Sequence, residues 1–171
     1  MKGPEREFII PVKGLPVGKH RYSFSIDGQF FRDFGNSQII TGSLVADVVL
    51  ARETACINLD SNIKGSVVVE CDRCLEELTV PLDINAKLLI KFAKGEQEND
   101  SDEIMILDPD ASELDIKQFL YDYICISLPV QAIHRDGECN PEMVKRLEKT
   151  MENSSESGGN FPFYGLKDII D

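Results

Sequence analysis

Two cysteines separated by two residues, Cys71 and Cys74, are the side chains whose spacing most clearly indicates chemistry in this sequence. A histidine and another cysteine, His134 and Cys139, lie five positions apart in the C-terminal third. A Cys-x-x-Cys pair with a distant His and Cys is a ligand set for a tetrahedral zinc ion. A site closed by four protein ligands has no position for a catalytic water, so its zinc is structural. We therefore expect a structural zinc site at Cys71, Cys74, His134 and Cys139.

The Cys-x-x-Cys pair has two other interpretations, a redox-active pair and two chemically idle thiols beside a turn. A redox pair normally gains a lowered thiolate pKa from a helix N-terminus, whereas Cys71 and Cys74 are flanked by strand-like runs. Cys56 is expected to be a small buried hydrophobe, and Cys125 is either the same or a replacement ligand. Five cysteines are an odd number, which argues against a complete disulfide framework and favours a reducing compartment.

Alternating apolar and polar residues predict strands on both sides of the Cys-x-x-Cys pair. The clearest strand runs from Leu78 to Phe92, where every even position is apolar. Further strands are predicted at residues 8–12, 21–26, 29–34, 42–52, 54–60 and 63–71. Because Asp60-Ser61-Asn62 and the Cys-x-x-Cys pair look like turns, the last of these runs should pair as successive hairpins. Such an antiparallel meander forms a curved sheet or a partial barrel.

The periodicity changes from 2 to about 3.6 after residue 115, which predicts one main helix from Ile116 to Leu128. Ser112 and Asp115 resemble a capping box, and Pro129 ends the helix. We expect this helix to cover the sheet, giving an α+β fold. The chain after this helix contains His134 and Cys139. A metal bound to them and to the Cys-x-x-Cys pair would therefore hold the C-terminal end of the helix close to the sheet.

The predicted organisation is a single α+β domain over residues 1–152, which includes an acidic loop at 95–115. A short charged helix is expected at residues 141–151, a Ser/Gly-rich flexible linker at 153–160 and an apolar C-terminal tail at 161–171. An apolar tail on a flexible linker docks either on its own domain or on a partner, and the sequence leaves both open.

Charge is segregated along the chain, whose net charge is -12. Residues 1–94 carry 12 acidic and 12 basic side chains, whereas residues 95–115 carry 9 acidic and no basic ones. Such a block repels nucleic acid phosphates and attracts a basic protein surface. It is also typical of a solvated, partly disordered loop.

Other function classes find less support in the residues. No segment has the pattern of a signal peptide or a spanning helix, so we expect a soluble, cytoplasmic protein without membrane contact. A nuclease needs carboxylates or histidines clustered on strand ends, but the carboxylates here crowd one loop, and His20 resembles an exposed loop residue. A curved sheet under a helix could enclose a small molecule, yet no convergent set of polar residues identifies such a substrate.

An ordered set of motifs resembles one known family. Glu-Cys-Asp-Arg-Cys-Leu-Glu at 70–76, Glu-Leu-Asp-Ile at 113–116, Ser-Leu-Pro at 127–129, then His134 and Cys139 are similar to the YceD family, the large ribosomal RNA subunit accumulation proteins. The tail at 161–170 also resembles the short ending common in that family. The resemblance covers roughly residues 40–170 and implies a bacterial or plastid factor that 23S rRNA needs to accumulate, with no reaction assigned to it.

Charge and resemblance together predict a non-enzymatic factor of large ribosomal subunit assembly or rRNA stability. Because a charge of -12 disfavours extensive contact with RNA, we expect an adaptor or chaperone for a basic ribosomal protein or a pre-50S particle. No catalytic residue is expected, and the zinc would be architectural. The alternative is a thiol-redox or RNA-processing enzyme that uses Cys71 and Cys74.

Overall fold

The computed structural model describes residues 8–35, 38–94 and 103–156, with the side chains up to residue 151. The chain divides into two compact units. Unit 1 comprises Met1–Glu70 and Glu77–Ala132, and unit 2 comprises Cys71–Glu76 and Ile133–Asp171. Unit 2 is therefore assembled from a short turn and the C-terminal part of the chain.

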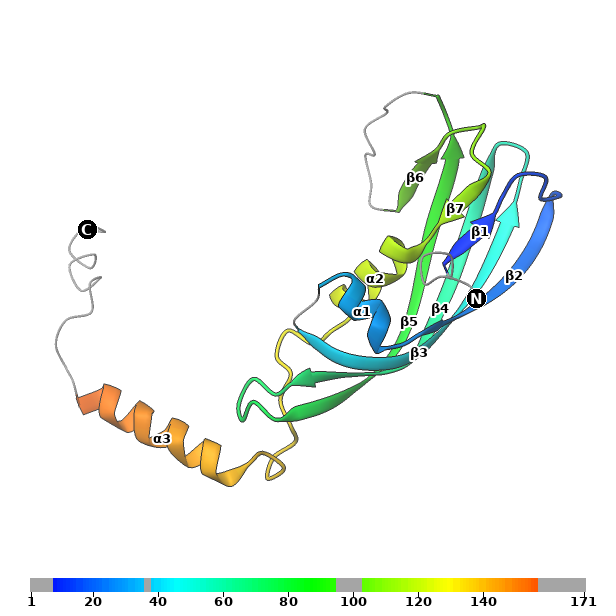
Figure 1. Cartoon of the computed structure of the whole chain (residues 1–171). Coiled ribbons are helices and arrows are strands. Elements are labelled where there is room, and N and C mark those ends of the chain that lie inside the picture. Colours follow the sequence, from blue (N-terminus) through cyan, green and yellow to red (C-terminus); the bar gives the residue numbers. More distant parts are fainter. Residues whose placement is uncertain (1–7, 36–37, 95–102, 157–171) are drawn as a thin grey trace, which may run out of the picture. The chain divides into compact units, whose positions relative to one another are not determined.

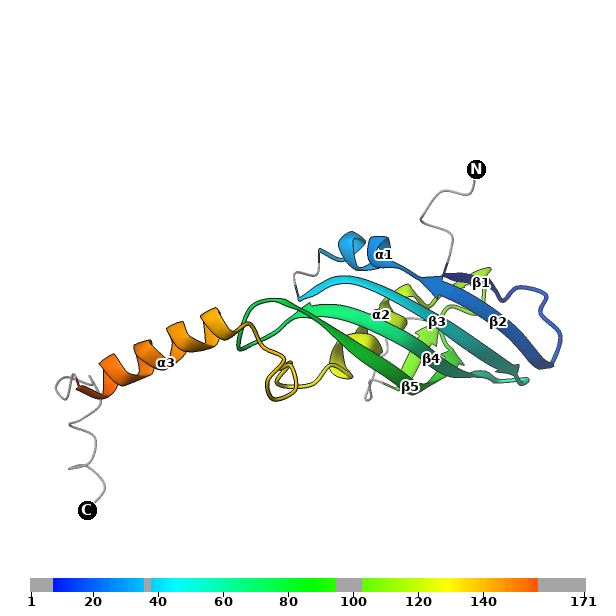
Figure 2. The same cartoon turned by 90° about the horizontal axis from the view of Figure 1, so that it is seen from below.

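Unit 1 is built on an open, five-stranded sheet in the order β2-β3-β4-β5-β6 (Figure 1). The strands are β2 (Gly18–Ile26), β3 (Ile39–Arg52), β4 (Cys56–Glu70), β5 (Glu77–Phe92) and β6 (Ile104–Leu107). The first four pair antiparallel in chain order, and β6 pairs parallel with β5. The long strands curve along their length, as Figure 2 shows from a second direction. The predicted α+β fold with a curved antiparallel meander is confirmed, and the sheet is not closed.

Strand β4 corrects the predicted arrangement of hairpins. The Asp60-Ser61-Asn62 segment does not form a turn, since Cys56–Glu70 is one uninterrupted strand. Both neighbouring strands pair across this segment, with Asp60 opposite Val49 on β3 and opposite Lys87 on β5. Continuous pairing on both sides therefore outweighs the local turn preference of these polar residues.

The segment 29–34 is a helix and not the predicted strand. Helix α1 (Gly28–Asp33) begins at Asp27, whose carboxylate accepts hydrogen bonds from the backbone N–H groups of Gln29 at 2.9 Å and Phe30 at 3.2 Å. This N-cap satisfies donors that would otherwise be unpaired. Phe30 and Phe31 are buried, so the aromatic run forms core and not a strand face.

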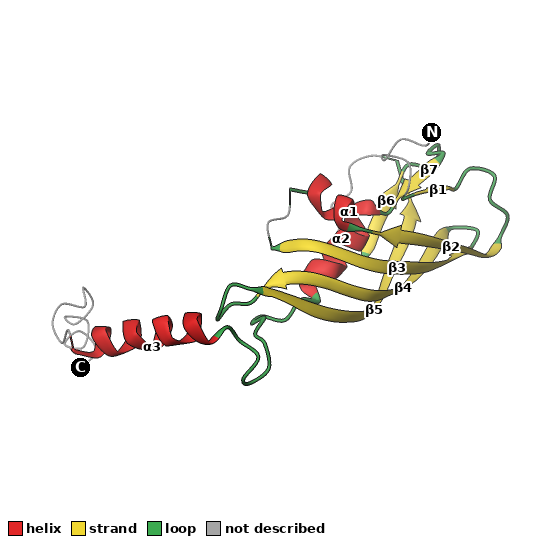
Figure 3. Cartoon of the chain, turned by 60° about the horizontal axis from the view of Figure 1, so that its bottom comes forward, coloured by secondary structure: helices red, strands yellow, loops and turns green. Residues whose placement is uncertain are grey.

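Helix α2 (Lys117–Ile126) crosses one face of the sheet (Figure 3) and buries Phe119, Leu120 and Ile124 in the core. The main helix is thus found where the periodicity predicted it. Its N-terminus differs, because residues 113–115 form strand β7 (Glu113–Asp115), which pairs with β1 (Ile9–Pro11). The predicted capping box is absent: the N-cap residue is Ile116, and the Asp115 carboxylate accepts from the backbone N–H of Lys117 at 2.8 Å.

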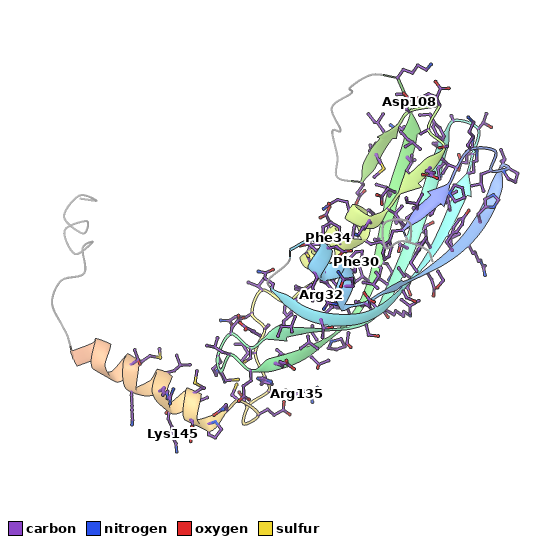
Figure 4. All side chains as sticks on the ribbon, viewed as in Figure 1. Phe30, Arg32, Phe34, Asp108, Arg135 and Lys145 are labelled. Atoms are coloured by element: carbon purple, nitrogen blue, oxygen red, sulfur yellow. The ribbon has the colours of Figure 1, made fainter. Side chains whose placement is uncertain are left out.

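Aromatic rings join the two helices of unit 1. Phe34 stacks on Tyr121 of α2 with ring centroids 3.9 Å apart and planes 15° apart. Phe30 lies edge-on to Phe34 at 5.3 Å, and Figure 4 shows both rings beside α2. The aromatics of this region therefore pack against one another, as the sequence predicted for core residues.

The described part of the acidic segment contains regular structure. Residues 103–115 contain β6 and β7 and end against α2, so this half of the predicted loop is tied into unit 1. The other half, residues 95–102, lies outside the described residues. Parallel pairing of β6 with β5 has no local sequence signal, since β6 is only four residues long.

Helix α3 (Pro141–Glu156) belongs to unit 2. It is longer than the predicted helix at 141–151 and includes residues 153–156, the first part of the predicted linker. The rest of the linker and the apolar tail at 161–171 lie outside the described residues. None of the helices in the described ranges is long and apolar enough to span a membrane.

Candidate metal centre

The first half of the site is the turn between β4 and β5. The backbone N–H of Cys71 donates to the carbonyl of Glu76 at 2.8 Å, and the N–H of Leu75 donates to the carbonyl of Cys71 at 2.8 Å. Leu75 has a φ of 62°, a left-handed conformation that reverses the chain after Cys74. Both thiols lie inside the turn, with relative exposures of 0% for Cys71 and 1% for Cys74.

The second half is the segment that precedes α3. A turn is closed by the N–H of Glu138, which donates to the carbonyl of Arg135 at 3.0 Å, and Gly137 supplies a φ of 87°. His134 and Cys139 flank this turn and are half-buried. Like the Cys71–Glu76 turn, this loop brings two potential ligands to one side of a short backbone reversal.

Asn140 joins the two halves within unit 2. Its side-chain N–H donates to the Glu76 carboxylate at 2.6 Å, and its side-chain oxygen accepts from the backbone N–H of Glu142 at 2.9 Å. The second bond caps α3, where Pro141 occupies the first helical position. Sequence analysis did not identify Asn140 or Glu76, although an Asn directly before a Pro is a recognisable signal for a helix start.

The four predicted ligands form one compact group. Their ligand atoms all lie within 4.8 Å of one another. The Sγ atoms of Cys71 and Cys139 are 3.9 Å apart, and the Nδ1 atom of His134 is 3.4 Å from the Sγ of Cys74 and 3.9 Å from the Sγ of Cys139. In a tetrahedron with Zn–S of about 2.3 Å and Zn–N of about 2.05 Å, ligand atoms are about 3.6–3.8 Å apart. The separations therefore fit a tetrahedral zinc ion.

The Cys71 thiol is prepared for metal binding by the backbone around it. Burial alone would raise its pKa, but hydrogen bonds from the backbone of Cys74, His134 and Arg73 favour the thiolate and lower the pKa to about 6. A thiolate is the form that binds metal. Since the donors come from both halves of unit 2, assembly of the unit itself creates this preference.

Cys139 shows the opposite effect. Burial and its hydrogen bonds with Cys71 and Cys74, together with the charges of these thiols, raise the pKa of Cys139 to about 11. Three adjacent sulfurs therefore oppose full deprotonation until a cation compensates their charge. A divalent ion would convert this mutual repulsion into attraction, which makes the group better suited to a metal than to three free thiols.

The donor set also indicates which metal and which role. Three thiolates and one imidazole suit zinc, and four protein ligands leave no open position, which is typical of structural zinc. The lowered pKa of Cys71 would equally suit a redox thiol, but a reactive cysteine is normally accessible, whereas Cys71 and Cys74 are buried. Zinc binding remains a prediction that this geometry supports.

The described part of unit 2 buries few side chains. Among its described side chains, Cys71 and Cys74 are the buried ones. Leu147 and Met151 of α3 are exposed by 43% and 72%. A small unit with so few buried apolar side chains in its described part is commonly stabilised by a disulfide or a metal. The five cysteines form no disulfide, so the four potential ligands offer metal binding as a means of stabilisation.

The remaining candidates lie elsewhere in the chain. Cys56 is on β4 and Cys125 on α2, and neither belongs to the group of potential ligands in the described part of the chain. His20 is on β2, and its Nε2 atom is 2.9 Å from the carbonyl oxygen of Pro16. The structure thus selects Cys139 and not Cys125 as the fourth potential ligand.

Comparison with known protein families gives one match. The sequence profile described as "Large ribosomal RNA subunit accumulation protein YceD" matches residues 59–169, which include both halves of the candidate site. No match was found among curated proteins or among solved structures.

Proposed function

This chain belongs to the YceD family of large ribosomal RNA subunit accumulation proteins, and from that membership we propose a non-enzymatic factor that binds a basic ribosomal protein or a pre-50S particle. Family membership carries the link to large-subunit rRNA. The adaptor or chaperone role and the nature of the partner are our proposal, supported by the distribution of charge.

The charge distribution is the observation that carries the adaptor role. A factor that raised rRNA levels by coating RNA would need a basic surface, because affinity for nucleic acid comes mainly from phosphate contacts. This chain has a net charge of -12 and 9 acidic but no basic side chains in residues 95–115. Such a surface attracts the basic proteins that bind rRNA and repels the rRNA itself.

The described part of the acidic segment presents its carboxylates to solvent. Glu103, Asp108, Asp110, Glu113 and Asp115 are all exposed. Figure 4 shows Asp108 at the end of β6, where the chain leaves the sheet. Lys94 forms an ion pair with Asp110 at 3.2 Å, whereas Asp108, Glu113 and Asp115 form no ion pair with a described residue. Because β6 and β7 anchor the segment, the charges are held on a fixed support.

The proposed zinc would be architectural in this function. It would hold the Cys71–Glu76 turn to the segment before α3 and so determine how the C-terminal part of the chain is presented. No step of chemistry is assigned to it. The predicted cytoplasmic localisation is part of the same proposal.

The alternative is a thiol-redox or RNA-processing enzyme that uses Cys71 and Cys74. The lowered pKa of Cys71 is the observation in its favour. A Cys71→Ser variant separates the two roles, because Cys71 is the thiol with the lowered pKa and a redox enzyme without it would lose thiol exchange with a small disulfide even when zinc is absent. A chain with a structural site would lose zinc and show no loss of exchange.

The proposal is tested by affinity purification of the tagged chain from its native cells at about 50 mM and about 300 mM salt. We expect recovery of a basic large-subunit protein or a pre-50S particle that falls at high salt, since exposed charges separated by more than about 10 Å are screened there. A variant with Asp108→Asn and Glu113→Gln should recover less of it. A control with Asp60→Asn and Asp83→Asn changes the charge equally on the sheet face and should behave as wild type.

Two outcomes would contradict the proposal. One is recovery without any ribosomal material at either salt concentration. The other is tight binding of the purified chain to 23S rRNA fragments without a protein partner and with a steep salt dependence, which would indicate direct phosphate contact.

A further inference from the structure

Strand β2 forms an open edge of the five-stranded sheet (Figures 1 and 3). It pairs with β3 over nine residues without a register shift, and no backbone hydrogen bond between described elements satisfies its other side. A long, regular edge of this kind is a template for another strand. The edge of β5 differs, because Pro81 there removes a backbone donor, a common way to prevent strand addition.

On the solvent face at the β2 edge, one carboxylate and one guanidinium group form no ion pair with a described residue of the same chain. The Ser23 hydroxyl donates to the Asp47 carboxylate of β3 at 2.8 Å, which draws this carboxylate toward the edge. Asp47 forms no ion pair within the described chain. Arg21 is exposed two positions before Ser23 and also lacks an ion pair with any described residue.

The core face of β2 carries aromatic rings that are only partly covered. Tyr22 and Phe24 are half-buried and stack with their centroids 6.4 Å apart. Phe24 also stacks on Phe8 at 5.8 Å, whereas Tyr22 has its ring contact with Phe24, so the half-buried Tyr22 keeps surface that a strand added beside β2 could cover.

We propose that the occupant of this edge is a second copy of the chain, whose β2 pairs antiparallel with this β2 about a two-fold axis at Tyr22. The two five-stranded sheets then form one continuous sheet. In this register the second copy's Arg21 lies opposite Ser23, one strand away from Asp47. Neighbouring strands are about 4.8 Å apart, so an arginine side chain can span Ser23 and reach the carboxylate.

The two-fold symmetry makes the interface self-complementary. Two Arg21–Asp47 ion pairs form, one on each side of the axis, and Lys19 lies opposite Ser25. Tyr22 lies beside the second copy's Tyr22, which covers part of the ring surface that is exposed in the monomer. No like charges face each other.

The neighbouring registers are less favourable. An axis at Arg21 places the two Arg21 side chains opposite each other, and directly opposed like charges destabilise a strand pair. An axis at Ser23 places Arg21 opposite Ser25, whose neighbour on β3 is the apolar Val45. Of the three registers, the one centred on Tyr22 therefore combines backbone pairing of the strands with ion pairs between opposite charges.

Space for the incoming side chains exists at the centre of this interface. A hollow of about 420 Å³ is lined by Arg21, Tyr22, Ser23, Asp47, Val48 and Val49. These residues surround the proposed axis on β2 and the paired positions on β3.

A charge exchange tests the dimer. Sedimentation equilibrium of the full chain at micromolar concentration should give twice the chain mass of 19.1 kDa. Arg21→Glu places a new carboxylate against Asp47, and Asp47→Arg places a new guanidinium group against Arg21, so each single variant should weaken the dimer by at least about tenfold. Because both residues are exposed, neither change should disturb the fold.

Two experiments that restore the Arg21–Asp47 charge complementarity distinguish this interface from any other. The double variant Arg21→Glu with Asp47→Arg should dimerise again, and an equimolar mixture of the two single variants should form a heterodimer. Lys91→Glu is a control with the same charge change as Arg21→Glu, placed at an exposed residue of β5 that has no ion pair with a described residue, and should dimerise as wild type. A monomeric wild-type chain, or a dimer that neither single variant weakens, would overturn the proposal.

Discussion

Cys71 and Cys139 are chemically different members of the candidate site although both are cysteines. The backbone N–H groups around Cys71 lower its pKa to about 6, whereas burial and neighbouring sulfurs raise the pKa of Cys139 to about 11. Residue type alone therefore predicts the potential ligands, and the surrounding backbone lowers the pKa of one of them to about 6.

This difference predicts how zinc affinity depends on pH. The folded-state pKa of Cys71 lies below its ordinary value of 9.0, so its thiolate is present at neutral pH and is lost as the pH falls through about 6. Cys139 competes for a proton at every pH below about 11. Zinc affinity should therefore fall as the pH falls from about 8 and should fall more steeply below about pH 6, where Cys71 also gains a proton.

Competition with a chromophoric chelator between about pH 5 and about pH 8 measures this dependence. Cys56→Ser provides the control, since Cys56 lies outside the group and its loss should leave the profile unchanged. Affinity that is constant over this range would show that these thiols do not bind the ion.

At the scale of elements, pairing partners decide what a segment becomes. The polar residues in the middle of β4 are satisfied by their neighbours: Lys87 lies 3.7 Å from the Asp60 carboxylate, and the Asn62 amide donates to Asn85 at 2.8 Å. A segment that resembles a turn in isolation is thus an ordinary strand within a sheet. Helix α1 shows the converse, since one N-cap and two buried rings make a helix from residues that alone resemble a strand.

Gly65 shows how closely β3 and β4 approach. It has a φ of 149°, and a side-chain carbon there would meet the backbone carbonyl of Ser43. Gly18 provides a matched comparison, since its φ is 141° but a side-chain carbon there would meet nothing. Strained backbone conformations cost about 1–3 kcal/mol for a residue other than glycine.

We expect Gly18→Ala to lower the free energy of unfolding by about 1–3 kcal/mol through backbone strain alone. Gly65→Ala should lower it further, because the β3 backbone must also move. Urea unfolding followed by circular dichroism compares the two. Equal destabilisation by both substitutions would show that the close approach to Ser43 has no energetic weight.

At the scale of the whole molecule, the described parts of the two units differ in how many apolar side chains they bury. Unit 1 has a large apolar core between its sheet and helices. The described side chains of unit 2 that are buried are two of the four potential zinc ligands. Metal binding should therefore affect the units unequally.

Removal of zinc with a chelator should increase hydrogen exchange at residues 71–76 and 133–140 while leaving the amides of β3 and β4 protected. The reason is that zinc binding contributes folding free energy only where the ligands are. Cys139→Ser should have the same effect without chelator, and Cys56→Ser should have none. Exchange in unit 2 that does not respond to either change would contradict a structural metal.

Local sequence patterns predicted two main elements of the fold and the members of the candidate site. Alternation along Leu78–Phe92 and the helical stripe from Ile116 predicted β5 and α2, because both patterns are local and repeat over many residues. The residue types and spacing likewise predicted that Cys71, Cys74, His134 and Cys139 lie together, since metal coordination demands specific donor atoms, and metal binding itself stays a prediction. Family membership followed from the same ordered motifs.

Other features depended on contacts that the local sequence does not contain. Continuity of β4 required strands on both sides, β6 required a parallel partner, and the division into two units required the Cys71–Glu76 turn to associate with the chain after Ile133. The sequence by itself determined which atoms could bind a metal and which faces could be buried. Tertiary structure decided that Cys139 completes the group, that Cys71 carries the lowered pKa and that Asn140 links the two halves, because each depends on groups far apart in the chain.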